Sequence, residues 1–305
     1  MTSQSNQRVI TETARSASAY VLAMRPKQWT KNVLVFAALV FSHNLDSVSA
    51  FIEVAIAFVC FCFASSAVYI LNDLGDRESD RLHPVKRFRP IAAGQVPVTH
   101  AVLMGISLAT FALGVGFILT PYFAALLLGY MLLNVTYSLY LKHEVIIDVF
   151  CISAGFVLRA AGGAVVLSVP ISPWLYVCTV VLALFVGFGK RRNELELLEG
   201  DAGGHRKNLD EYSAPLLDQF IVVTAATTVM AYSLYTVVAA NLPANHLMMI
   251  TIPFVLYGIF RYLYLVHQKK EGGAPEQLIL TDRPLLGAVF LWGVTSVVIL
   301  YGPWV

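Results

Sequence analysis

The amino-acid sequence predicts an all-α polytopic membrane protein with nine transmembrane helices. Hydrophobic residues make up 57% of the 305 positions, charged residues only 13%, and the mean hydropathy is +0.69. Soluble domains carry about 25% charged residues, so this chain lacks the composition of a water-facing surface. The abundance of apolar residues excludes intrinsic disorder. A net charge of +2 gives no indication of nucleic-acid binding.

Nine apolar runs approach or reach the roughly 20 residues that a helix needs to cross a bilayer. They cover residues 32–50, 51–72, 97–119, 121–141, 145–168, 172–189, 219–240, 246–266 and 284–301. The first run is the weakest, because His43, Asn44 and Asp46 crowd its far end. Residues 1–20 are polar and contain no apolar run, so we expect a flexible cytoplasmic tail there. Residues 21–305 are then expected to form a single domain.

The positions of the basic residues support this count. If nine spans alternate sides, 19 of the 21 Lys and Arg residues lie on one side, and only Arg159 and Arg261 fall within spans. Cytoplasmic loops carry such an excess of Lys and Arg. The sequence therefore predicts a multi-pass protein of the cell (inner) membrane, with its N-terminus inside, its C-terminus outside and its active site facing the cytoplasm.

An acidic segment follows the second predicted span. Asn72, Asp76 and Asp80 are spaced four residues apart, and Asp73 stands three before Asp76, so on a helix all four share one stripe. Like charges at this spacing destabilise a helix unless a cation compensates them. Carboxylate oxygens are ligands that suit Mg²⁺ together with substrate phosphates. We expect Asp73, Asp76 and Asp80 to be metal ligands and catalytic residues, and Asn72 to bind substrate.

One group of basic residues precedes the first predicted span and another follows this stripe. Binding of lipid headgroups at the membrane surface would account for either group alone. Together with the acidic stripe they favour a site for a polyanionic phosphate. Asp148 and Arg159 lie eleven residues apart, three turns along one predicted helix, and ionisable residues within spans are candidate functional residues. The predicted substrate-binding residues of this group are Lys27, Lys31, Arg87, Arg89, Lys142, Asp148 and Arg159.

The sixth predicted span ends in a second charged motif. Lys190 and Glu194 are four residues apart and face the same way on a helix, with Arg191 beside them. A solvated helix end with one intrahelical pair is the alternative. We expect Lys190, Arg191 and Glu194 to bind substrate, and the glycine-containing stretch 199–210 to be a loop that could fold over a ligand.

With these motifs the chain resembles the intramembrane UbiA prenyltransferase superfamily, whose members have nine helices around a central cavity. Its first motif, N-D-x-x-D-x-x-x-D, is met by Asn72–Asp80, whereas its usual second motif, D-x-x-x-D, is replaced by Lys190–Glu194. In this replaced motif and in its residues 25–32 and 156–159, the chain resembles the branch of decaprenyl-phosphate phosphoribosyltransferases.

The resemblance implies a Mg²⁺-dependent transfer of 5-phosphoribose from phosphoribosyl pyrophosphate to decaprenyl phosphate. Pyrophosphate is released, and the product begins the supply of an arabinose donor for cell-wall polysaccharide. It also implies that the acidic stripe holds Mg²⁺ and the donor diphosphate. The implied partners are the two substrates and the lipid bilayer, without nucleic acid, and a homo-oligomer is left open.

Two alternative functions remain at this stage. An ordinary member of the superfamily would join a prenyl diphosphate to an aromatic acceptor, and the altered second motif argues against it. A secondary transporter would be expected to show inverted repeats and interrupted helices, and we find no such repeat in the sequence.

Overall fold

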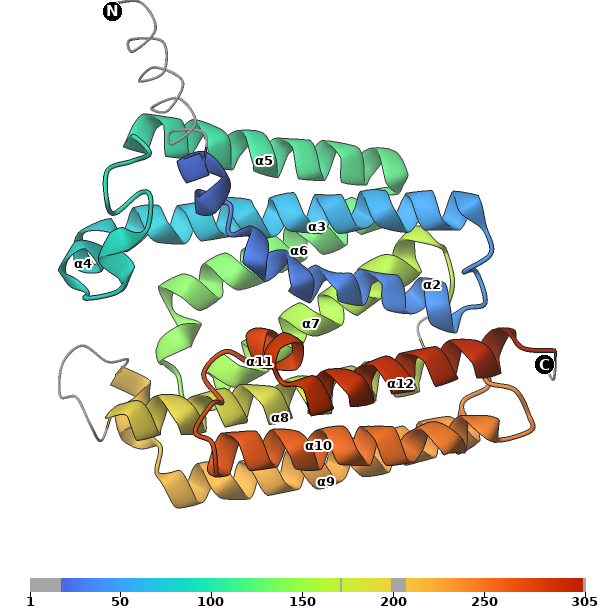
Figure 1. Ribbon diagram of the computed structural model, residues 1–305. Coiled ribbons are helices and arrows are strands. Elements are labelled where there is room, and N and C mark those ends of the chain that lie inside the picture. The colour runs from blue at the N-terminus through green and yellow to red at the C-terminus, as the bar shows by residue number, and fades with distance from the viewer. Residues whose placement is uncertain (1–17, 171, 199–206, 304–305) are drawn as a thin grey trace, which may run out of the picture. The chain divides into compact units, whose positions relative to one another are not determined.

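The computed structural model describes residues 18–170, 172–198 and 207–303, and all regular elements within these ranges are helical (Figure 1). The chain divides into two compact units. Unit 1 comprises residues 1–33 and 56–138, and unit 2 comprises residues 34–55 and 139–305. Of the expected tail, residues 1–17 lie outside the described part, as do residues 199–206 of the expected loop, while residues 18–23 are helical and Ala19 is buried.

Eight described helices are long and apolar enough to cross a membrane, and they correspond to the last eight predicted spans. These spans are α3 (Val48–Gly75), α5 (Val98–Leu119), α6 (Pro121–Leu139), α7 (Ile147–Val166), α8 (Pro173–Leu198), α9 (Ala214–Val238), α10 (Ile252–His267) with the 3₁₀ turn η5 (Leu247–Thr251), and α12 (Arg283–Tyr301). The shorter elements are α4 (Arg77–Leu82), η2 (Lys86–Phe88), η3 (Leu141–His143), η4 (Lys207–Glu211) and α11 (Pro275–Thr281).

The first predicted span is not a regular α-helix. In its place stand the 3₁₀ helix η1 (Pro26–Phe36) and the short helix α2 (Ala37–Phe41), which ends before a turn where His43 has a φ of +58°. A 3₁₀ helix rises about 2.0 Å per residue and an α-helix 1.5 Å. The 16 residues of η1 and α2 therefore extend about 30 Å, the thickness of a hydrocarbon core, with fewer residues than an α-helix needs.

In unit 1, polar side chains join η1 to α3. Trp29 Nε1 donates a hydrogen bond to Ser66 Oγ at 3.1 Å, and Asn32 Nδ2 donates to Cys62 Sγ at 3.3 Å, both on α3. Residues three apart lie on one face of a 3₁₀ helix. Trp29 and Asn32 therefore contact α3 together, and the buried amide of Asn32 is satisfied by that helix.

Helix α5 packs on α3 through small residues. Ala101 and Ala112 of α5 are buried, and a Cβ on Gly105 would lie 3.5 Å from Cγ2 of Ile70 on α3. Small residues at a helix contact let the backbones approach closely inside a membrane. Most other side chains of α5 and α6 are exposed, as expected for helices that face lipid.

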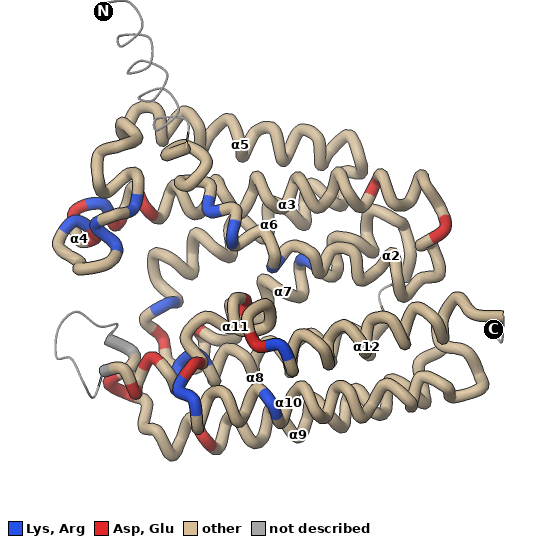
Figure 2. The backbone as a smooth tube through the Cα atoms, viewed as in Figure 1, with Lys and Arg blue, Asp and Glu red and all other residues tan. Residues whose placement is uncertain are grey.

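Charged residues gather at one end of the helices in each unit (Figure 2). In unit 1 they lie around α4 and the adjacent end of α3, and in unit 2 they lie where α8 ends, α9 begins and α10 ends. Glu53 and Asp46 are acidic residues elsewhere, near the start of α3. Lys27 and Lys31 on η1 and Arg261 on α10 are basic residues elsewhere, and most of the remaining helix surface is apolar, as a membrane requires.

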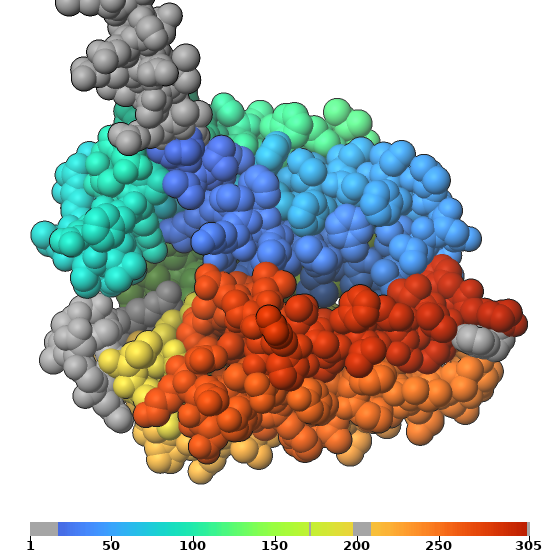
Figure 3. Space-filling view, viewed as in Figure 1, coloured from blue at the N-terminus to red at the C-terminus, as the bar shows by residue number. Residues whose placement is uncertain are grey.

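Unit 2 has an apolar core that α8, α9 and α10 share. Phe185, Phe188, Leu217, Ile221 and Leu265 are among its buried members. Helices α10 and α12 are in contact and form a continuous face of side chains (Figure 3), whose exposed members include aromatic and aliphatic residues. This face has the composition of a lipid-contacting surface.

Helix α7 contains a glycine where the backbone of another segment approaches it very closely. A Cβ on Gly163 would stand 2.0 Å from the carbonyl oxygen of Val35, at the end of η1. Only glycine permits this separation, since no real Cβ contact is that short. Gly163 therefore lets the segment before α2 lie directly against α7.

Candidate functional site

The acidic segment of unit 1 is a helix–helix junction. The predicted stripe required helical geometry over residues 72–80, and in the structure α3 ends at Gly75 and α4 begins at Arg77. Asp76 stands between them with φ −89° and ψ 4°, and backbone hydrogen bonds continue across it, from Asp76 N to Asn72 O and from Asp80 N to Asp76 O, both at 2.8 Å. The stripe therefore survives in a bent form, because glycine disfavours helix continuation and neighbouring carboxylates repel each other.

Two arginines neutralise the buried carboxylates of this junction. Asp73 and Asp80 are each 2% exposed. The NH1 group of Arg89 donates to Asp73 Oδ1 at 3.1 Å and to Asp80 Oδ2 at 2.7 Å. Arg25 forms a further short ion pair with Asp73. Buried charges require such partners, so the arrangement gives two carboxylates converging on one cationic group.

The other predicted residues of unit 1 are more open. Asn72, Asp76 and Lys31 are half-buried, and Lys27 is exposed on η1. Arg87 is exposed and its guanidinium lies 4.8 Å from the ring centroid of Phe88. Within the described residues no three acidic, His or Cys side chains form a closed metal-binding group. The structure thus brings Asp73 and Asp80 together and leaves Asp76 beside them.

In unit 2, the second motif distributes its side chains to different neighbours. Arg191 Nε bonds Asp148 of α7 at 2.7 Å, and Arg192 Nε bonds Asp218 of α9 at 3.0 Å. Asn193 Nδ2 donates to the carbonyl of Lys270, after α10, at 2.7 Å. The loop approaches closely there, since a Cβ on Gly273 would lie 2.7 Å from Asn193 Oδ1. These three consecutive residues connect α8 to three other segments of the unit.

Lys190 and Glu194 occupy the remaining face of that turn. Lys190 Nζ lies 4.0 Å from Glu194 Oε1, and the two side chains are 37% and 27% exposed. Arg191 NH1 also donates to Glu194 Oε2 at 2.5 Å. Arg191 itself is only 1% exposed, and its partner Glu194 lies between it and the surface. The end residues of the motif are therefore the ones accessible to a ligand.

A buried hydrogen-bonded chain lies behind Glu194. Asp148 is fully buried and accepts from Arg191 and, at 3.3 Å, from the hydroxyl of Tyr212. The same hydroxyl accepts from the backbone N–H of Ile146 at 2.6 Å. Ile146 has a φ of +70°, which is strained for a β-branched residue, and Tyr212 holds it there. Burial is the main cause that raises the pKa of Tyr212 to about 12, so its hydroxyl keeps its proton.

Arg159 and Lys142 complete the predicted residues of unit 2. Arg159 is buried in the middle of α7, donates to the carbonyl of Gly155 at 2.7 Å and lies 5.4 Å from the ring centroid of Phe156. Lys142 is half-buried in η3. A charged group buried inside a span is costly, which marks Arg159 as a candidate for anion binding.

The sequence profile of the UbiA prenyltransferase family matches residues 33–301. The chain belongs to this family. It is 37% identical to a decaprenyl-phosphate phosphoribosyltransferase of Corynebacterium glutamicum over 293 residues, covering 93% of this chain and 87% of that protein. The identity to the protein of the same name in Mycobacterium tuberculosis is 35%, covering 92% of this chain and 93% of that protein.

Solved structures of UbiA homologues have the same fold. A homologue from Archaeoglobus fulgidus bound to GPP and Mg²⁺ superposes with a TM-score of 0.69 at 18% identity, covering 92% of this chain and 96% of that one. The same homologue bound to DMAPP and Mg²⁺ gives a TM-score of 0.69, also at 18% identity, with 93% and 99% coverage. The UbiA fold and the multi-pass membrane class predicted from the sequence are thereby confirmed.

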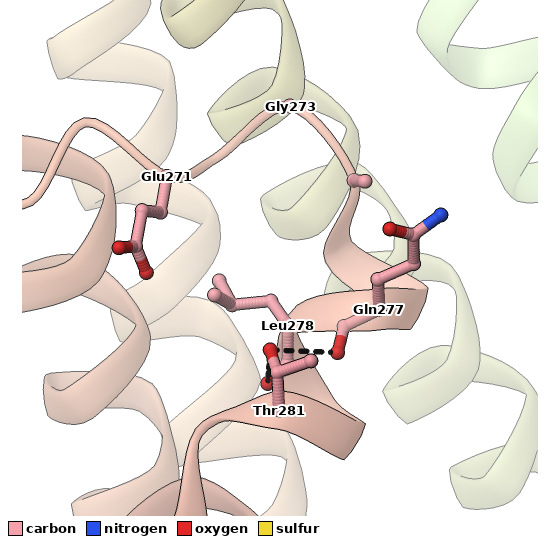
Figure 4. A pocket seen from close by; sticks show the side chains of 6 residues that line it. Glu271, Gly273, Gln277, Leu278 and Thr281 are labelled. Carbon is pink, nitrogen blue, oxygen red and sulfur yellow. Dashed lines mark hydrogen bonds between the residues drawn. The ribbon is translucent and has the colours of Figure 1, made fainter.

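Two pockets of this UbiA-family protein are lined by none of its predicted site residues, although Asp218 and Gly273 in their linings contact Arg192 and Asn193 of the second motif. One, of about 430 Å³, is lined by Asp218, Gln219, Val222 and Val223 on α9. The other, of about 260 Å³, lies at the loop before α11 (Figure 4) and is lined by Glu271, Gly273, Ala274, Gln277, Leu278 and Thr281. The Thr281 hydroxyl there donates to the carbonyl of Gln277 at 3.0 Å. Neither pocket contains a cluster of converging charges.

Sequence reasoning missed two residues at these sites. Arg25 is in the run 25–32 that the sequence analysis used, but only its contact with Asp73 distinguishes it from Lys27 and Lys31 of the same run. Tyr212 follows the loop after α8, and no spacing relates it to Asp148, 64 residues earlier. The only signal for Tyr212 was its place between two charged segments, and this was too weak to identify it as a site residue.

Proposed function

We propose that this UbiA-family protein transfers a 5-phosphoribosyl group from phosphoribosyl pyrophosphate to decaprenyl phosphate. The bond between the anomeric carbon and the pyrophosphate oxygen breaks, the acceptor phosphate oxygen forms a new bond to that carbon, and pyrophosphate leaves. The relatives that match over most of their length carry the name of this activity. The product would supply an arabinose donor for cell-wall polysaccharide.

The observation that carries the proposal is the second motif of α8. A second metal site would need acidic ligands at both ends of the motif, and Lys190 occupies one end with an accessible ammonium. An ammonium repels a divalent cation and attracts a phosphate. Arg191, Arg192 and Asn193 are committed to neighbouring segments, so the motif suits a phosphate better than a metal–diphosphate complex.

We assign the divalent cation of this reaction to the junction of α3 and α4. Asp73 and Asp80 already share one cationic group, the NH1 of Arg89, within hydrogen-bond distance of both. Hard carboxylate oxygens that converge in this way suit Mg²⁺, and Asp76 stands at the same junction. Mg²⁺ bound there would neutralise the charge that develops on departing pyrophosphate. Asn72, Arg87 and Arg89 would contact the phosphates of the donor.

The remaining residues would bind and orient the substrates. Lys190 would contact a substrate phosphate, and Glu194 would accept hydrogen bonds from ribose hydroxyls. Asp148 and Arg191 would fix the position of Glu194 through their buried contacts. Lys27, Lys31, Lys142 and Arg159 would supply further positive charge for phosphate groups. The acceptor phosphate is already anionic near neutral pH, so the reaction requires no strong general base.

We further propose that the reaction takes place at the cytoplasmic side of the cell membrane. The Lys and Arg excess of the loops supports this orientation through the positive-inside rule. The polyprenyl tail of the acceptor would remain in the hydrocarbon region while its phosphate meets the charged helix ends. The mass of the protein in detergent measures whether it assembles as a homo-oligomer.

The decisive experiment is an assay with the purified protein in lipid. Phosphoribosyl pyrophosphate labelled in the ribose is incubated with Mg²⁺ and decaprenyl phosphate, and the lipid phase is extracted. Label in the lipid phase supports the proposal. Transfer from a prenyl diphosphate to an aromatic acceptor, without transfer of labelled ribose, would establish the ordinary prenyltransferase reaction instead. Uptake of label into vesicles with no chemical change would indicate a transporter.

A further inference from the structure

Two cations at the charged end of α10 contact one tyrosine ring. The guanidinium of Arg261 lies 5.0 Å from the ring centroid of Tyr264, and the ammonium of Lys269 lies 6.0 Å from the same centroid. Tyr264 is exposed and stands three residues before the end of α10. Tyrosines near the end of a span lie at the level of the lipid headgroups. Tyr264 therefore holds two cations at that level.

The start of α12 adds a third cation beside them. Asp282 accepts hydrogen bonds from two nitrogens of Arg261, at 3.1 and 2.8 Å, which neutralises this arginine and joins the start of α12 to α10. Arg283 follows directly and is exposed. Among the residues that the structure describes, neither Lys269 nor Arg283 has an acidic partner. These two cations and the exposed Glu271 together leave one positive charge in excess.

Apolar surface continues from these cations along both helices. Phe260 precedes Arg261 on α10, and Leu286 and Phe290 follow Arg283 on α12; all three apolar side chains are exposed. They belong to the face that α10 and α12 form together (Figure 3). A ligand that matches both parts of this surface has an anionic head and apolar chains.

We propose that the adjoining ends of α10 and α12 form a binding site for an anionic phospholipid. Lys269 and Arg283 contact the phosphodiester oxygens of its headgroup, and its acyl chains lie along Phe260 and Phe290. Basic groups between transmembrane helices bind anionic headgroups in this way. The pair of Arg261 and Asp282 positions the other groups, because it fixes the start of α12 beside Tyr264. This inference does not depend on which group the enzyme transfers.

Lipid binding to the delipidated full chain in detergent tests the proposal. Native mass spectrometry measures the affinity for dioleoylphosphatidylglycerol, which is anionic, and for dioleoylphosphatidylcholine, which has the same chains and no net charge. We expect the wild type to bind the anionic lipid roughly tenfold more tightly, the attraction expected of one or two basic residues. In Lys269→Gln/Arg283→Gln this preference should disappear.

Two measurements separate the site from general charge and from folding. Arg81→Gln/Lys86→Gln is the matched control, because it also removes two positive charges from exposed residues, in unit 1. It should keep the preference of the wild type. The thermal midpoint of Lys269→Gln/Arg283→Gln in lipid-free detergent should equal that of the wild type, since neither side chain has an acidic partner to lose.

Equal affinity of the wild type for the two lipids would overturn the proposal, and this measurement needs no variant. A preference that persists in Lys269→Gln/Arg283→Gln would also overturn it. If the preference persists there and disappears in Lys190→Ala, the anionic lipid occupies the proposed substrate site instead. Transfer of labelled phosphoribose is measured separately, so either proposal can fail while the other stands.

Discussion

At the residue scale, neighbouring polar side chains on the turn of α8 that contains Lys190 point in different directions and contact different partners. Successive residues of an α-helix point about 100° apart, so Arg191, Arg192 and Asn193 reach different segments while Lys190 and Glu194 share the remaining face. The buried pairs cost desolvation energy that their short hydrogen bonds offset. The motif is thus both a structural centre of unit 2 and the source of two accessible groups.

Lys190 should govern substrate affinity. Loss of a charge-assisted phosphate contact weakens binding by roughly 1.5–3 kcal/mol, or about ten- to a hundredfold. Lys190→Ala should therefore raise the KM for phosphoribosyl pyrophosphate or for lipid phosphate, and Lys190→Asp should be worse because it faces a phosphate with an anion. Steady-state kinetics with each substrate varied in turn measure this. Full activity of Lys190→Asp would contradict the phosphate-binding role.

Tyr212 should matter for stability although no sequence motif contains it. In Tyr212→Phe the backbone N–H of Ile146 loses its acceptor and Asp148 loses a donor. An unsatisfied buried polar group costs about 1–3 kcal/mol, so the thermal midpoint of the purified protein should fall. The control is Tyr122→Phe, where the side chain is 80% exposed. An unchanged midpoint in Tyr212→Phe would show that this chain of hydrogen bonds is dispensable.

Residues on regular spacings were the ones that the sequence analysis could assign. Asp73 and Asp80, and Lys190 and Glu194, lie near each other because helix periodicity places them so. Arg25 and Tyr212 meet their carboxylate partners through tertiary packing, across 48 and 64 residues. No local pattern encodes such a contact. The same packing buries Asp148 and Arg191, which spacing alone cannot distinguish from accessible residues.

At the element scale, close contacts between backbones set the tightest limits on which residue a position can accept. Gly163→Ala would place a methyl group 2.0 Å from the carbonyl oxygen of Val35, a backbone atom that cannot turn aside. Overpacking of this kind costs roughly 1–3 kcal/mol or more, so we expect a clear loss of thermal stability. Gly293→Ala on α12 meets nothing within 4 Å and should be neutral or stabilising by about 0.5–1 kcal/mol. Equal midpoints for the two variants would contradict the close approach.

The start of α12 should make stability depend on pH. Asp282 accepts from the backbone N–H of Leu285 and from two nitrogens of Arg261, and the hydrogen bond with Arg261 is the main cause that lowers the pKa of Asp282 below 3.8. A lowered pKa in the folded protein contributes stability above the ordinary value, which is lost as pH falls through the folded value. The thermal midpoint of the wild type should exceed that of Asp282→Asn at neutral pH, and the gap should close in acid. A gap independent of pH would contradict the ionic contribution.

Eight of the nine spans were predictable because long apolar runs have few alternatives in a membrane. The first was not, since composition does not distinguish a 3₁₀ helix from an α-helix. In the structure Trp29 and Asn32 bond to α3, and these partners lie 37 and 30 residues away in the chain.

At the scale of the whole molecule, the number of crossings fixes which chain ends share a side. If η1 and α2 cross the membrane together, the total is nine and the termini lie on opposite sides. We expect Ser3→Cys and Lys269→Cys to react with an impermeant maleimide from the cytoplasmic side, and Pro303→Cys from the other. The parent protein, whose four cysteines lie within helices, provides the background. Reaction of Ser3→Cys and Pro303→Cys from one side would mean that η1 and α2 do not cross.

The 3₁₀ geometry of η1 also bears on which bilayers suit the protein. An 11-residue segment that changed from 3₁₀ to α geometry would shorten by about 5 Å, a length comparable with the thickness differences between natural membranes. Such a change would turn Trp29 and Asn32 about 60° apart around the helix axis, which would weaken their shared contact with Ser66 and Cys62. If η1 and α2 cross the membrane, they do so with a length that shortening would change only at the expense of their contacts with α3. The thickness of the surrounding lipid should then match this length.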